Sequence, residues 1–246
     1  MAAIVLAGSV LAWLMGLAVG ARLLRIAART HQTPELAIGL SYVLTAGFGF
    51  PPLILASQLR ASQPDLGQML LVFAQFPICA GLFATSLGAW RIFRPAARWP
   101  GVLIALIWGS TATFVGRAIL AEDYLDFRVE SWNAILAGTL GWVWMSVESF
   151  LLWSKLRKRA RFGLASPEVT NRVLLWGVSS VAAIVSSAVG RIQIEITDLD
   201  VKSFVALAHS ADLWACAIAM WLAFFPPVAY RRRVAAQRNL AAQGGT

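Results

Sequence analysis

The chain has 246 residues and a formal net charge of +9; 59% of its residues are hydrophobic and only 13% are charged. Soluble domains carry about 25% charged residues, so this composition excludes an ordinary soluble protein, and its high hydrophobicity excludes a disordered one. The basic excess does not indicate nucleic-acid binding, because it is divided among four short segments that flank apolar stretches.

Seven apolar stretches predict membrane-spanning helices. They cover residues 3–27, 36–58, 69–93, 101–121, 132–154, 171–193 and 204–229. Each is near the roughly 20 residues that cross a hydrocarbon core. Barrel strands would be about half as long and would alternate in polarity. We therefore expect an all-α integral membrane protein: a seven-transmembrane helix bundle over residues 1–234, followed by a disordered tail over residues 235–246.

Basic residues follow the first, third, fifth and seventh spans. They are Arg22, Arg25, Arg29, Arg91, Arg94, Arg98, Lys155, Arg157, Lys158, Arg159, Arg161, Arg172, Arg231, Arg232, Arg233 and Arg238. The other ends of the spans carry most of the acidic residues. Basic loops stay in the cytoplasm, which predicts an outside N-terminus, a cytoplasmic C-terminus and a multi-pass location in the cell inner (plasma) membrane.

The preference for Arg over Lys, with abundant Ala, is typical of a GC-rich bacterial genome. No basic residue precedes the first span, which argues against a cleaved signal peptide.

Two sequence features leave the partners open. The basic run from Lys155 to Arg161 is expected to keep its loop inside, but it could also hold anionic lipid headgroups or a protein partner. Gly8, Ala12, Gly16 and Gly20 form a stripe of small residues that favours close packing. This packing would be either within the bundle or in a homo-oligomer.

The cytoplasmic starts of the second and sixth spans resemble each other. Thr33-Pro34-Glu35 and Ser166-Pro167-Glu168 each predict a hydroxyl N-cap, a proline at the first helical position and an acid in the first turn. Pro100 is expected to begin the fourth span in the same way. The offset of 133 residues between Thr33 and Ser166 recurs between Asp65 and Asp198, and Cys79 and Cys216 lie 137 apart. These offsets favour a 3+1+3 arrangement of two parallel repeats, and shared topology alone is the alternative.

Prolines fall inside three of the expected spans. Pro51-Pro52, Pro77 and Pro226-Pro227 are expected to kink or interrupt the second, third and seventh spans. Such breaks mark ligand-lining helices in some membrane proteins, although fixed kinks are also common.

Ionisable residues inside spans are costly, so each is a candidate functional residue. His209, Asp212 and Cys216 are three and four residues apart and share one face of the seventh span. Glu148 lies in the inner half of the fifth span. Gln75, Arg117 and Arg191 complete the candidates for a ligand or ion site.

Two interpretations of these residues remain open. Asp212, His209, Gln75, Arg117 and Arg191 could line an outer-half cavity, with Asp212 paired with an arginine or kept neutral by desolvation. They could instead form interhelical ion pairs or hydrogen bonds that lock the bundle. Glu148 is either a proton or coupling-ion site or a neutral acid bonded to a neighbouring group.

The chain lacks the residues of the common membrane cofactor sites. Its three lysines, Lys155, Lys158 and Lys202, are outside the seventh span, which argues against a retinal Schiff base. Its two histidines, His31 and His209, are too few for a bis-histidine haem or a His-rich metal site. The two cysteines suit apolar packing, and no phosphate-cradling or hydrolase motif occurs. We expect no cofactor, no metal and no catalytic residue.

Three functions fit these observations. A small-molecule or ion transporter would use the prolines, the repeat and the intramembrane acids. A ligand-binding sensor would use the outer polar residues and signal through the basic inner loops. An accessory or scaffold subunit of a membrane complex would need no pocket, and an enzyme is the least supported class.

Overall fold

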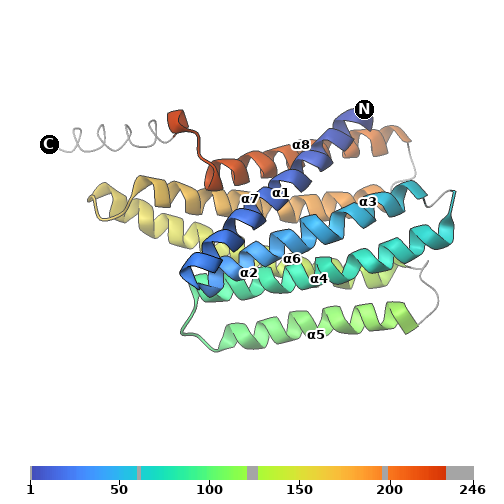
Figure 1. Ribbon diagram of the computed structural model, residues 1–246, viewed down its shortest axis with the longest axis horizontal. Helices are drawn as coiled ribbons and strands as arrows, with labels where there is room; N and C mark the ends of the chain where they lie inside the picture. The colour runs from blue at the N-terminus through green and yellow to red at the C-terminus, as the bar shows by residue number, and fades with distance from the viewer. Residues whose placement is uncertain (1, 60–61, 121–126, 196–198, 231–246) are drawn as a thin grey trace. The chain divides into compact units, whose positions relative to one another are not determined.

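The computed structural model describes residues 2–59, 62–120, 127–195 and 199–230, and within these ranges the chain is helical with short turns and no strand (Figure 1). The expected disordered tail, residues 235–246, lies outside the described residues. Nine helical elements occur in the described ranges: α1 (Ala2–Thr30), α2 (Thr33–Tyr42), η1 (Val43–Gly49), α3 (Phe50–Leu59), α4 (Pro64–Phe93), α5 (Trp99–Leu120), α6 (Phe127–Arg161), α7 (Pro167–Glu195) and α8 (Leu199–Phe224).

Five helical segments in the described residues are long and apolar enough to cross a membrane. They are Val10–Thr30, Thr33–Ala56, Pro64–Phe93, Pro167–Val189 and Leu207–Phe224. In α5 the apolar part, Trp99–Gly109, is shorter. The predicted helical membrane class is thus confirmed at the level of helix length and composition.

The distribution of side chains also suits a lipid environment. The most deeply buried side chains are small or hydroxylic, such as Ser41, Thr85 and Ser149. Large apolar side chains are exposed instead; Leu106 is 67% exposed and Val102 is 63% exposed. Small residues at helix contacts let backbones approach in membranes, where large apolar side chains lose nothing by facing lipid.

The chain divides into two compact units. Unit 1 comprises Met1–Ala12 and Val143–Thr246, and unit 2 comprises Trp13–Trp142. The division passes through α1 and α6, so each unit takes part of both helices.

The core of unit 2 is the packing of α4 along α2, η1 and α3. Small residues make the approach close. A Cβ added to Gly81 would lie 2.6 Å from Cγ2 of Thr45 and 2.9 Å from the Ser41 carbonyl oxygen. At the same contact the hydroxyls of Ser41 and Thr85 are 2.5 Å apart, and Thr45 Oγ1 donates to the Ser41 carbonyl over 2.6 Å. Hydrogen bonds thus accompany van der Waals contact where α2 and η1 pack on α4.

The prolines act differently in the three helices. Pro51 and Pro52 do not interrupt the second span; the chain winds as the π-helix η1 before them, and the Phe50 amide bonds the carbonyl of Thr45, five residues back. The wider winding accommodates the missing proline N–H groups. Pro77 does not interrupt α4, which continues through it, and the expected kink at Pro77 stays a prediction. The interruption at Pro226-Pro227 is confirmed, and it ends α8 at Phe224 rather than at residue 229.

The predicted helix starts are confirmed in part. Pro100 is the second residue of α5, and α7 begins at Pro167 after Ser166, whose carbonyl accepts from the Thr170 amide over 3.0 Å. The expected hydroxyl cap at Thr33 is wrong, because Thr33 is already helical and Gln32 occupies the N-cap without a side-chain cap bond.

In unit 1, α7 packs lengthwise against α8. Glycines allow α1 and α6 to pack closely against this pair. A Cβ on Gly8 of α1 would lie 3.1 Å from the indole Nε1 of Trp214 in α8. A Cβ on Gly177 of α7 would lie 3.1 Å from the Phe150 ring of α6. In unit 2 the approach is closer still: a Cβ on Gly16 would lie 2.8 Å from Cβ of Ala46, and a Cβ on Gly20 would lie 2.9 Å from Cγ2 of Val43. The small-residue stripe of α1 is therefore used for packing within the chain.

Candidate functional site

The seam between α7 and α8 holds the polar residues of greatest interest. The imidazole Nε2 of His209 lies 2.8 Å from the Ser186 hydroxyl. Two turns along, the Cys216 thiol points to the Ser179 carbonyl at 3.7 Å. In a pair of antiparallel helices, a step of seven residues forward along one helix corresponds to a step of seven residues back along the other. The two contacts differ by such a step, so they belong to the same register. The face that the sequence predicted for His209 and Cys216 therefore lies against α7.

Asp212 lies on α8 between these two contacts. Its carboxylate oxygen Oδ2 is buried and has no hydrogen-bond partner among the residues that the structure describes. A buried carboxylate oxygen without a partner costs roughly 1–3 kcal/mol or more, so structures rarely retain one without a reason. The position therefore offers an acceptor that a proton, a cation or a ligand donor could satisfy.

Glu148 lies on α6, also in unit 1, and is buried at 9% exposure. The next residue, Ser149, is fully buried, and its hydroxyl has no hydrogen-bond partner within the described ranges. The role of Glu148 as a proton or coupling-ion site, and the alternative of a neutral acid bonded to a neighbouring group, both stay predictions.

The other three candidates are less defined. Gln75 is a half-buried residue of α4, and Arg117 is in α5; both belong to unit 2. Arg191 is in the last two turns of α7. The side chains of Arg117 and Arg191 lie outside the described residues. The expected convergence of all five outer residues on one cavity therefore stays a prediction.

Sequence reasoning missed the α7 side of the seam. Ser179 and Ser186 are seven residues apart, so they occupy nearly the same face of a helix. That spacing matches the seven residues between His209 and Cys216 and could have indicated the pairing. The hydroxyl contact between Ser41 and Thr85 was also missed, because nothing in the sequence specifies the register of α2 on α4.

One carboxylate, one imidazole and hydroxyls of the seam provide oxygen and nitrogen atoms that can bind a proton or a small cation. The Ser186 hydroxyl and Nε2 of His209 are also at the distance expected of a nucleophile–base pair. In the described part of the chain, no three His, Cys, Asp or Glu residues come together as a metal site.

Scans against protein-family models, curated proteins and solved structures give no match to this chain.

Proposed function

We propose that the protein is a membrane transporter for a small cation or a protonatable small molecule, with Asp212 as its ion-binding carboxylate. The observation that carries the proposal is the buried Oδ2 of Asp212, which lies between two polar contacts of the α7–α8 seam and has no partner among the described side chains. Intramembrane acids in transporters act as proton or ion sites, and their burial cost is tolerated for that role. His209 is the neighbouring proton acceptor, and Glu148 is a second acid on α6.

The proposal includes a seven-span topology in the inner membrane, with the N-terminus outside. The lengths of α5, 22 residues, and α6, 35 residues, support the two spans beyond the five apolar ones. At about 1.5 Å per residue each could cross a core of about 30 Å. The basic segments support the orientation.

A parallel repeat is part of the same proposal. In unit 2, Ser41 of α2 faces Thr85 of α4. If the two halves are repeats, the offset of 133 makes Leu174 the equivalent of Ser41, and the offset of 137 makes Leu222 the equivalent of Thr85. Extending the observed register of α7 on α8 places Leu174 opposite Trp221, one residue from the expected partner. Repeats of this kind place substrate sites near the middle of the membrane.

The test is charge movement in proteoliposomes containing the purified chain. We would record currents on a solid-supported membrane after concentration jumps of H⁺, Na⁺ or K⁺. One of these cations is expected to give a protein-dependent current that Asp212→Asn abolishes, because the amide keeps the shape and loses the charge. His209→Asn is expected to reduce the current.

A matched control is Asp65→Asn, which changes an exposed acid in the first turn of α4. It should leave the current unchanged. Currents that survive Asp212→Asn would contradict the role of this residue. If wild-type protein gives no current with any of the three ions, transport is rejected in favour of a sensor or an accessory subunit.

A further inference from the structure

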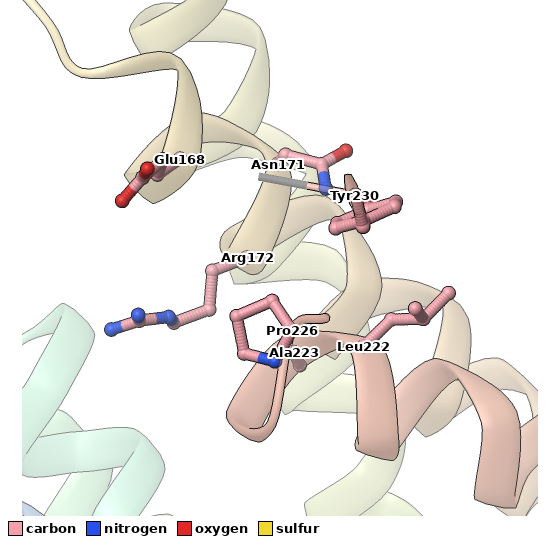
Figure 2. A pocket seen from close by; sticks show the side chains of 7 residues that line it. All are labelled: Glu168, Asn171, Arg172, Leu222, Ala223, Pro226 and Tyr230. Atoms are coloured by element: carbon pink, nitrogen blue, oxygen red, sulfur yellow. Dashed lines mark hydrogen bonds between the residues drawn. The ribbon is translucent and has the colours of Figure 1, made fainter. Parts of the chain in front are cut away.

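An open pocket lies where the first turns of α7 meet the segment after α8 (Figure 2). It belongs to unit 1 and is separate from the Asp212 seam. Proline cannot continue a helix, so the chain leaves the axis of α8 at Pro226. Tyr230 then returns to α7, where its hydroxyl accepts a hydrogen bond from Asn171 Nδ2 (Figure 2). The pocket is the space left between this return and α7.

The walls of the pocket differ in chemistry. Leu222, Ala223 and Pro226 form an apolar side, and Arg172 extends from α7 beside Pro226 (Figure 2). Arg172 is exposed, so its guanidinium group is accessible. Arginine presents its N–H donors in a planar fork that matches two oxygens of a phosphate. One acid, Glu168, lies one turn earlier on α7 and also lines the pocket.

The turn that joins α6 to α7 exposes two large apolar side chains at the same end of unit 1. Phe162 is 79% exposed and Leu164 is 76% exposed. Gly163 between them has a φ of +71°, and its amide bonds the Ala160 carbonyl while the Leu164 amide bonds Arg159. This glycine-dependent helix ending turns the chain sharply and leaves both side chains facing outward.

Exposed basic residues come shortly before these apolar side chains in the chain. Lys155, Arg157, Lys158 and Arg159 are in the last two turns of α6, and all four are exposed. Arg157 also lies over the Trp153 ring at 5.4 Å. Exposed apolar residues among cations are typical of surfaces that enter the headgroup layer of an anionic membrane.

We propose that this end of unit 1 is a binding site for one anionic phospholipid, with the headgroup phosphate on Arg172 and the glycerol backbone against Leu222, Ala223 and Pro226. Phe162 and Leu164 enter the lipid layer beside it. The basic residues of α6 attract the membrane surface, and Arg172 distinguishes the bound lipid from the bulk. The charge complementarity selects a phospholipid with a net negative headgroup over a zwitterionic one.

The experiment measures binding of short-chain phosphatidylglycerol to the full chain in neutral detergent, with short-chain phosphatidylcholine as the comparison. Each cation near a surface contributes about 1 kcal/mol, so loss of Arg172 should weaken binding by about fivefold. We expect wild-type protein to prefer phosphatidylglycerol and Arg172→Gln to lose that preference. Arg172→Lys should retain part of it, because lysine keeps the charge and loses the fork. Phe162→Ser with Leu164→Ser should weaken both lipids alike.

The matched control is Arg98→Gln, an exposed arginine before α5 in unit 2, which should keep the preference. Circular dichroism and melting curves verify that each variant is folded, and Arg172→Lys keeps the test valid if Arg172→Gln does not fold. Equal binding of both lipids, or equal losses in Arg172→Gln and Arg98→Gln, would overturn the proposal. So would full competition by inorganic phosphate at the lipid concentration, because the pocket would then be a general anion site.

Discussion

Nε2 of His209 and Oγ of Ser186 are 2.8 Å apart and join α8 to α7 inside a helical membrane protein. The contact combines a titratable ring with a hydroxyl that can either donate or accept. It holds the register of the seam one turn away from Asp212. The same contact therefore contributes to the packing of unit 1 and to the surroundings of the candidate ion site.

The first prediction concerns the strength of this contact. A double-mutant cycle of His209→Ala and Ser186→Ala should give a coupling of about 0.6 kcal/mol, and at most about 1.7, which is the range of interhelical hydrogen bonds in membranes. The measurement is the free energy of unfolding in mixed SDS micelles. His31→Asn is the control: His31 is exposed with a φ of 55°, a conformation that Asn tolerates. Strictly additive single effects would show that the contact is not formed in solution.

The second prediction concerns the stability cost of Asp212. Because its Oδ2 has no partner among the described residues, Asp212→Leu should raise the free energy of unfolding by about 1–3 kcal/mol, since the substitution removes the orphaned acceptor. A functional residue that lowers stability behaves in this way. Asp65→Leu at the exposed start of α4 should change stability by no more than about 0.5 kcal/mol. A loss of stability in Asp212→Leu would instead identify a structural ion pair or hydrogen bond.

The third prediction concerns the close approach at Gly81. Gly81→Ala should destabilise the protein by about 1–3 kcal/mol, since the new methyl would meet Thr45 and the Ser41 backbone. Gly109→Ala in α5 is the matched control, because no atom lies within 4 Å of its added Cβ. It should be neutral or stabilise by up to about 1 kcal/mol. Thermal unfolding in detergent compares the two variants, and equal effects would contradict the packing of α4.

The fourth prediction concerns orientation. Ser62 and Ala96 are exposed residues at opposite ends of α4. In a background with Cys79→Ala and Cys216→Ala, a membrane-impermeant maleimide should label Ser62→Cys in intact cells. Ala96→Cys should react only after permeabilisation, because basic loops stay inside. The opposite labelling pattern would reverse the topology and place the Arg172 pocket outside.

Local features of the fold followed from the sequence. The apolar stretch at residues 69–93 lies within α4, and the stretch at 171–193 lies within α7, because burial in lipid depends on local hydropathy. Pro100 and Pro167 marked helix starts for the same local reason. At Pro51-Pro52 local reasoning was insufficient, since whether a proline bends, widens or ends a helix depends on the helices packed around it.

Only the α8 half of the candidate site was predictable from the sequence. Hydropathy and helical spacing selected His209, Asp212 and Cys216 on one face of α8. Their partners on α7, Ser186 and Ser179, depend on how two helices slide along each other, which hydropathy does not encode. The sequence alone determined the helical membrane class and the charged segments, because these depend on the composition of short stretches. Only the tertiary structure decided that Asp212 Oδ2 has no partner in the described part of the chain and that Arg172 borders a pocket, because both depend on which side chains from distant segments come within reach.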